Sequence, residues 1–253
     1  MSRNFELLQK LEQEQRLQPE VVPLSRSIAA SEISSLDAET EREAQPRKHF
    51  PDEVCTLVRR LFLLDCAGPR AVVFSSVERG AGCSWIAAHC AQALATQTKQ
   101  SVCLVDANLF FPALHNFFEV ENSHGFAEAM SNSQPLEKCA TQVAPRNLWL
   151  LTSGNGPAHD MLSDIDSLRS CMRQLREQFD YAIIDTPPWN LYSHAEVLGS
   201  VSDGIVLVLK ANSSRRVATQ KLVTEMKAAN IRLFGAVLNQ RTFPIPQAIY
   251  DRL

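Results

Sequence analysis

Three short segments of the chain carry residues that could bind a phosphate group and a divalent cation. The first, FSSVERGAGCS, places Gly80 and Gly82 before the hydroxyl of Ser84. Glycines at this spacing let the backbone curl so that its N–H groups converge on phosphate oxygens, and the N-terminus of a following helix adds a favourable field. The other two, SVCLVDAN and DYAIIDTPP, end apolar runs in Asp106 and Asp185. A carboxylate held at the end of a buried strand is a suitable Mg²⁺ ligand.

The elements that must position these residues alternate along the chain. Six apolar runs predict strands at 71–75, 101–106, 148–152, 181–185, 204–210 and 233–239. Nearly continuous apolar runs are typical of strands covered on both faces, as in a parallel sheet. Helical patterns are predicted around and between them, at 51–66, 84–98, 164–179, 194–201 and 215–230. The alternation predicts a doubly wound, mainly parallel α/β sheet, whose ligands bind at the carboxyl ends of the strands.

The first fifty residues have a different character. Apolar residues at helical spacing, from Phe5 to Leu11, predict a short amphipathic helix, and the polar, proline-containing stretch after it predicts a flexible linker. Residues 1–49 are therefore expected to precede an α/β domain at 50–253. Docking of this helix on a partner and a weakly ordered terminus are both open interpretations.

Composition excludes several classes of protein. The 253 residues are 45% apolar with a net charge of −3, which rules out collagen-like and wholly disordered chains and argues against a nucleic-acid partner. Seven cysteines without a CxxC pair indicate reduced thiols, and no structural metal is expected. No stretch reaches the length of a membrane span, and the start lacks the features of a secretory signal. We expect a cytoplasmic protein whose membrane association would come through a partner.

The strand, glycine loop and helix around residues 71–98 have the arrangement of a P-loop. The nucleotide-binding residues predicted from it are Glu78, Arg79, Gly80, Ala81, Gly82, Cys83 and Ser84. Ser84, Asp106 and Asp185 are the predicted magnesium ligands, and the two aspartates are also the catalytic candidates. The expected cofactor is Mg-ATP or Mg-ADP.

Cys83 stands where a P-loop has the lysine that reaches the β and γ phosphates, and Val77 stands at the first glycine. At about 3 Å and an effective dielectric near 20, such a lysine contributes about 5 kcal/mol of attraction. Arg79 is a candidate replacement. Two interpretations of Cys83 are open: a reactive thiol whose pKa is lowered by the helix N-terminus, and a small residue accommodated after loss of the lysine.

Residues 52–253 resemble the bacterial tyrosine autokinases of capsular and exopolysaccharide synthesis, the CpsD/CapB group, which are related to the MinD/ParA ATPases. That family has motifs resembling TSSxxPGEGKS, LLIDADLRRPxLH and DYVIIDTPP, where this chain has FSSVERGAGCS, CLVDANLFFPALH and DYAIIDTPP. The resemblance implies a P-loop NTPase-like fold and an ATP-dependent protein-tyrosine kinase. It also implies a membrane-embedded chain-length or export partner and a homo-oligomer.

The chain departs from the family pattern at several positions. Asn108 replaces the second aspartate of the second motif, and Phe110 replaces the arginine after it. Such kinases end in a tyrosine cluster, whereas only Tyr250 lies near the end of this chain. An oligomerisation motif resembling ExxRxxR survives only in part, at Glu53 and Arg59. Each change is expected to weaken the kinase chemistry or its self-substrate.

These observations predict a nucleotide-binding regulatory protein of capsular or exopolysaccharide biosynthesis with weak or no kinase activity. Two alternatives are open. One is an active kinase or ATPase in which Arg79 or a partner's basic residue replaces the lysine, and the other is a non-enzymatic scaffold that binds no nucleotide.

Overall fold

A computed structural model describes residues 51–65, 68–131, 134–156 and 164–241, all of which belong to one compact unit, Lys48–Leu253. The predicted N-terminal helix and linker lie outside the described residues, as does Tyr250. The predicted domain boundary at residue 50 therefore stays a prediction. Within the described part of the chain, no helix is long and apolar enough to span a membrane.

The described residues form one sheet of seven strands in the order β3-β4-β2-β5-β1-β6-β7. The strands are β1 (Ala71–Ser76), β2 (Val102–Asp106), β3 (Ala140–Val143), β4 (Leu148–Leu151), β5 (Tyr181–Asp185), β6 (Gly204–Lys210) and β7 (Leu233–Asn239). Every neighbouring pair is parallel except β3 and β4. The predicted doubly wound fold is confirmed, and each of the six predicted strands is present to within one residue.

The sequence patterns did not predict β3. This strand is an antiparallel edge strand of four residues, and the side chains of Thr141 and Gln142 are exposed. A short edge strand with polar residues lacks the apolar run that marks a buried strand, so periodicity offers little signal for it.

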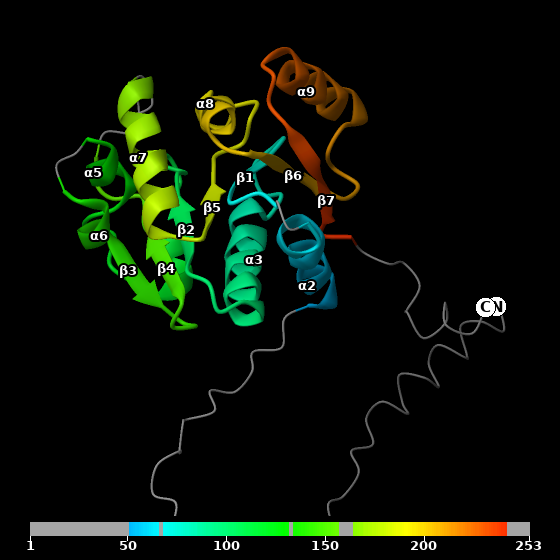
Figure 1. The fold of residues 1–253 in the computed structure, drawn as a ribbon. Helices are drawn as coiled ribbons and strands as arrows, with labels where there is room; N and C mark the ends of the chain where they lie inside the picture. The colour runs from blue at the N-terminus through cyan, green and yellow to red at the C-terminus, as the bar shows by residue number, and fades with distance from the viewer. Residues whose placement is uncertain (1–50, 66–67, 132–133, 157–163, 242–253) are drawn as a thin grey trace, which may run out of the picture. The chain divides into compact units, whose positions relative to one another are not determined.

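Helices cover both faces of the sheet (Figure 1). They are α2 (Asp52–Val58), the π-helical turn η1 (Arg59–Leu63), α3 (Cys83–Gln97), α4 (Leu114–Phe118), α5 (Phe126–Met130), α6 (Leu136–Cys139), α7 (Ile165–Gln178), α8 (His194–Val201) and α9 (Arg216–Ala228). Figure 1 shows α7, α8 and α9 on one face and α2 and α3 on the other, and each face has its own buried apolar cluster. The predicted helix at 51–66 is α2 continued by η1.

The helix that follows the glycine loop, α3, lies deep in the fold. Its sequence is rich in alanine, and Ala87, Ala88 and Ala91 have no exposed surface. Small side chains let the helix approach the sheet and α2 closely, which suits the dense packing of protein interiors. The start of α3 is thereby fixed directly above the carboxyl end of β1.

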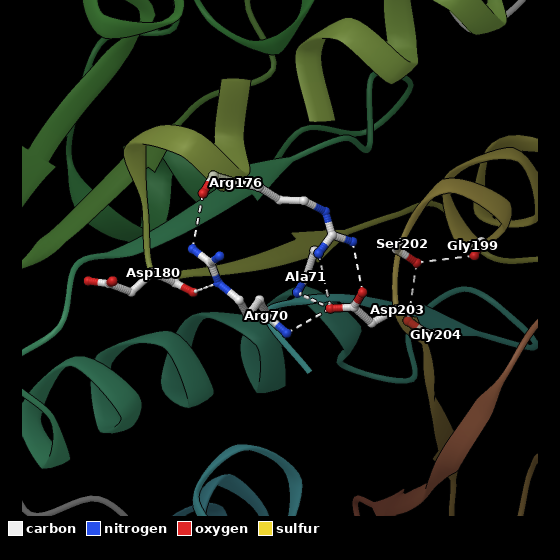
Figure 2. Close-up of polar contacts among 8 residues, drawn as sticks. All are labelled: Arg70, Ala71, Arg176, Asp180, Gly199, Ser202, Asp203 and Gly204. Atoms are coloured by element: carbon white, nitrogen blue, oxygen red, sulfur yellow. Dashed lines mark hydrogen bonds and ion pairs between the residues drawn. The ribbon is translucent and has the colours of Figure 1, made fainter. Parts of the chain in front are cut away.

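An ion-pair network joins the amino ends of three neighbouring strands, β5, β1 and β6 (Figure 2). The Asp203 carboxylate, just before β6, accepts hydrogen bonds from the backbone N–H groups of Arg70 and Ala71 at 2.7 and 2.8 Å. Arg176 at the end of α7 donates to the same carboxylate at 2.8 and 3.3 Å. The Arg70 guanidinium donates to the carbonyls of Arg176 and Asp180, both at 3.0 Å. The network fixes the strand ends opposite the glycine loop.

The environment of Asp203 sets its pKa. Partial burial acts to raise it, but the hydrogen bonds from Arg176, Ala71 and Arg70 outweigh burial and hold the pKa below its ordinary value. A carboxylate whose pKa is depressed by folding stabilises the protein above its unfolded pKa, about 3.9, and this contribution is lost as the pH falls through the folded value.

Replacing Asp203 with alanine is expected to lower the free energy of unfolding by about 2–3 kcal/mol at pH 7, because charge-assisted hydrogen bonds from three residues lose their acceptor. Urea unfolding followed by circular dichroism measures this. The matched control is Asp166→Ala, which removes an exposed partner of Arg169 at 3.4 Å and should cost less than about 1 kcal/mol. Equal losses in the two variants would contradict a structural role for the network.

Candidate nucleotide site

The loop between β1 and α3 adopts the curled backbone that its glycines predict. Gly80 and Gly82 have φ angles of +77° and +80°, in the left-handed region where other residues are strained. Gly82 also caps the N-terminus of α3, so the first N–H groups of that helix have no acceptor within the helix itself. The loop therefore presents backbone donors at the carboxyl end of β1.

Two amide side chains, one at the end of β7 and one directly after it, donate hydrogen bonds to carbonyl groups of this loop. Asn239 Nδ2 donates to the Ala81 carbonyl at 2.8 Å, and Gln240 Nε2 donates to the Gly80 carbonyl at 2.9 Å. A Cβ atom on Gly82 would lie only 2.4 Å from Asn239 Nδ2, so this contact also requires a glycine. Asn239 and Gln240 are not among the site residues predicted from the sequence; their position at a strand end, in FGAVLNQ, is the signal that could have found them.

The loop borders a pocket of about 240 Å³. Its lining residues are Ser76, Arg79, Gly80, Ala81, Gly82, Cys83, Ser84, Trp85, Asn108, Phe111, Thr186 and Pro188. Pockets that hold a whole drug-sized ligand usually measure about 300–1,000 Å³. The volume therefore suits a phosphate chain better than an entire enclosed nucleotide.

Asp106 and Asp185 lie side by side beneath the loop. They are paired in register at the ends of β2 and β5, and neither has exposed surface. The Asp106 carboxylate accepts hydrogen bonds from the N–H groups of Asn108, Ala113 and Leu114 at 3.1–3.2 Å. Burial nevertheless raises the pKa of Asp106, because these bonds and nearby His115 only partly offset it. Asp106 thus shapes the turn after β2, and neither it nor Asp185 is among the residues that line the pocket.

Asp185 is buried without a comparable set of donors. Among the described residues, neither of its carboxylate oxygens has a hydrogen-bond partner of good geometry. Burial and the neighbouring Asp106 raise its pKa, while the Ser84 hydroxyl and the Cys83 thiol beside it act weakly in the opposite direction. An unpartnered buried carboxylate is costly unless a cation satisfies it.

This arrangement fits Mg²⁺ bound together with phosphates. Magnesium usually takes one or two protein oxygens and completes its shell with water and phosphate oxygens. Asp185 and the Ser84 hydroxyl would hold it, with Asp106 behind them. The described residues contain no cluster of three or more His, Cys, Asp or Glu side chains that could hold a metal ion by themselves.

Cys83 is not the reactive thiol of the first sequence interpretation. Its side chain is nearly fully buried, and burial together with the adjacent Asp185 raises the pKa of the thiol well above its ordinary value. The expectation of a lowered pKa is therefore wrong. The helix N-terminus does not compensate for removal of the thiolate from water next to a carboxylate.

The other predicted loop residues differ in where their side chains point. The Glu78 carboxylate accepts a hydrogen bond from the Ser214 hydroxyl at 2.9 Å and is absent from the pocket lining described above. The Arg79 guanidinium lies 3.6 Å from the ring centre of Phe111, at the pocket wall. Of the seven predicted nucleotide-binding residues, all but Glu78 line the pocket.

Asn108 and Phe110, which stand where the family pattern has an aspartate and an arginine, contact a backbone N–H group and aromatic rings. The Asn108 side chain accepts a hydrogen bond from the Phe111 N–H at 3.3 Å, which closes the turn after β2. The Phe110 ring stacks on Tyr192 with a centroid distance of 3.7 Å and meets His194 edge-on. These positions are built into the packing beside the pocket.

The two tryptophans that flank the site in sequence have different surroundings. Trp85 lines the pocket and stacks on His89, with 44% of its surface exposed. Trp189 is buried, and its indole N–H donates to Glu225 at 3.1 Å. Packing therefore accounts for Trp189, while Trp85 is placed to contact a ligand.

The parallel sheet, with its glycine loop and strand-end carboxylates, has the P-loop NTPase-like fold of the MinD/ParA type. Solved structures agree on the fold. A chimerical protein, CapA2B2, matches with a TM-score of 0.71 and 22% identity over 80% of this chain and 88% of its own. The septum site-determining protein MinD of Pyrococcus horikoshii OT3, complexed with Mg-ADP, matches with a TM-score of 0.58 and 22% identity, over 72% of this chain and 76% of its own.

Sequence comparison places the chain in a family. Residues 70–231 match the family of cellulose biosynthesis protein BcsQ, and the chain belongs to this family. The tyrosine-protein kinase YwqD of Bacillus subtilis is 28% identical over 214 residues, which cover 84% of each chain. The tyrosine-protein kinase Ptk of Acinetobacter johnsonii is 26% identical over 70% of this chain, which spans only 24% of that longer protein. The resemblance to bacterial tyrosine autokinases is confirmed.

Replacing Asp185 with asparagine tests the cost of the buried carboxylate. Because its folded pKa is raised, the folded protein binds protons more tightly than the unfolded one, so stability without Mg²⁺ falls as the pH rises from about 5 to 8. Asp185→Asn should reduce this slope and raise the free energy of unfolding at pH 8 by about 1–2 kcal/mol. Denaturant unfolding across this pH range measures both.

The matched control for that experiment is Asp180→Asn. The Asp180 carboxylate is paired with the Ser101 N–H and hydroxyl at 2.8 and 2.9 Å. This variant should keep the wild-type slope. An unchanged slope in Asp185→Asn would show that the buried carboxylate is satisfied in solution.

Alkylation by iodoacetamide tests the environment of Cys83. The thiol of Cys83 should react at least tenfold more slowly than that of Cys55, which is only partly buried, because both access and thiolate content are reduced. Peptide mass spectrometry after timed labelling at pH 8 gives both rates in one sample. Faster labelling of Cys83 would restore the reactive-thiol interpretation.

Proposed function

We propose that this chain is a nucleotide-binding regulatory protein of polysaccharide biosynthesis with little or no phosphoryl-transfer activity. The observation that carries the proposal is the buried, unpartnered carboxylate of Asp185 beside Ser84, beneath a glycine loop whose backbone donors are available. A phosphate chain with its cation supplies what both features need. The family of cellulose biosynthesis protein BcsQ supports the connection with a polysaccharide.

The binding role follows from the loop residues. The backbone N–H groups of residues 80–84 would cradle phosphate oxygens, and Ser84 and Asp185 would hold the cation. Bound Mg²⁺ would neutralise the phosphates and the carboxylate together. Trp85 and Phe111 lie on the pocket wall, where they can shield the phosphate chain from water.

Weak or absent transfer follows from three substitutions. Cys83 supplies no positive charge at the lysine position, and its thiol faces Asp185. Asn108 cannot accept a proton as an aspartate would, and its oxygen is engaged by the Phe111 N–H. Phe110 stacks on Tyr192 where kinase relatives have arginine. Catalysis requires charge stabilisation in the transition state, and these positions no longer provide it.

The proposed partner is a membrane-embedded chain-length or export protein, and the nucleotide state would modulate that contact. The N-terminal segment is the proposed contact region, and a homo-oligomer is part of the same proposal. The membrane-embedded partner and the homo-oligomer are both implied by the resemblance to the kinase family.

Titration calorimetry of the full chain with Mg-ADP and Mg-ATP tests the proposed function, together with phosphate-release and phosphotyrosine assays. We expect binding without turnover. Turnover that is lost in Arg79→Ala would favour an active enzyme in which Arg79 replaces the lysine, since Arg79 lies at the pocket wall. No heat with either nucleotide would favour a scaffold.

The two loop glycines provide a matched pair of variants. Gly80→Ala and Gly82→Ala introduce the same strain at nearly equal φ, about 1–2 kcal/mol each. Only the new methyl group of Gly82→Ala meets Asn239, whereas nothing lies within 4 Å of the one at Gly80. Mg-ADP affinity should therefore fall at least tenfold more in Gly82→Ala than in Gly80→Ala. Equal losses would show that the anchor from β7 does not shape the binding loop.

A further inference from the structure

The proposed phosphate site has two parts, of which one is retained in this chain and the other has lost its lysine. The inner part is the backbone cradle of residues 80–84, whose glycine conformations and carbonyl anchors are all present. The outer part is the position of the missing lysine, which in a P-loop reaches the β and γ phosphates. The inner part needs only backbone N–H groups, so its ability to hold one phosphate group does not depend on the lysine.

The charges around the outer part are unfavourable for an additional anion. Asp185, which lies beside Cys83, and its neighbour Asp106 are fully buried at adjacent strand ends, and neither is among the residues that line the pocket. A cysteine side chain supplies no positive charge, and that of Cys83 lies beside Asp185. Arg79 is the one cationic side chain among the lining residues that the structure describes, and its guanidinium rests on the Phe111 ring at 3.6 Å.

We infer that this site selects nucleoside diphosphates over nucleoside triphosphates. The inference rests on the proposed nucleotide-binding function and specifies its ligand. A diphosphate places its terminal phosphate in the inner cradle and its cation beside Ser84 and Asp185. A triphosphate adds about one further negative charge at the outer part, where this chain lacks the lysine that normally balances it.

Selection of a diphosphate specifies the signal to which the proposed regulatory protein would respond. A site that favours ADP responds to a fall in the ATP-to-ADP ratio, because ADP is then the form that occupies it. In an active kinase, by contrast, the triphosphate must bind productively. The same loss of charge at Cys83 therefore accounts for both the weak transfer chemistry and the diphosphate preference.

Calorimetric titration of the full chain with Mg-ADP and with a magnesium complex of a non-hydrolysable ATP analogue tests the inference. We expect at least tenfold tighter binding of ADP, equivalent to about 1.4 kcal/mol. Pyrophosphate and tripolyphosphate, titrated in the same way, should show the same order, because the preference arises from the phosphates alone. Equal or tighter binding of the triphosphate would overturn the inference.

A matched pair of variants at Cys83 tests whether the missing lysine charge causes the preference for ADP. Cys83→Lys should tighten binding of the ATP analogue at least tenfold and remove the preference for ADP, whereas Cys83→Ser should keep ADP ahead because it adds no charge. Thermal unfolding confirms that each variant is folded, and the wild-type comparison stands without them. If neither nucleotide binds, the proposed function itself is wrong; if both bind equally, the function stands and the selectivity is wrong.

Discussion

Two carboxylates are buried next to each other at the ends of β2 and β5, where Asp106 and Asp185 are paired in register. Removing charged groups from water is costly, and the protein meets this cost in two different ways. The turn after β2 folds back so that three backbone N–H groups reach Asp106. Asp185 has no comparable set of backbone donors, and among the described residues neither of its oxygens has a hydrogen-bond partner. The shape of that turn depends on this pair, and the proposed nucleotide site depends on it as well.

The two ends of the sheet are built for different purposes. At the amino ends of β5, β1 and β6, Arg70, Arg176 and Asp203 satisfy one another and the local backbone. At the carboxyl ends, polar groups are left without protein partners, and the glycine loop depends on Asn239 and Gln240 from β7. Satisfied groups at one end hold the strands in register, and this register brings the unsatisfied groups at the other end together.

The departures from the kinase motifs are integrated into the structure. Cys83 is buried against Asp185, Asn108 closes a turn, and Phe110 is part of an aromatic stack with Tyr192. Each of these residues is held by specific neighbours, so the site is well packed without the charged groups of the kinase pattern. The retained glycine loop and the uncharged residues around it are the features on which the proposed regulatory role rests.

Sequence patterns alone determined much of this protein, because their signals are local. Apolar runs marked six of the strands, a helical pattern over 164–179 marked α7, and two glycines with Ser84 marked the loop. The departure at Cys83 was also visible from the motif. The short edge strand β3 and the turn of π-helix after α2 have no comparable local signal.

Only the tertiary structure decided how these residues act together. Burial decided between the two interpretations of Cys83, because the loss of solvent and the nearby Asp185 raise the pKa of its thiol. The side chain of Glu78 faces Ser214, and Asn239 is brought to the loop from 158 residues away. Such effects depend on desolvation and on contacts between distant segments, which spacing along the chain does not encode.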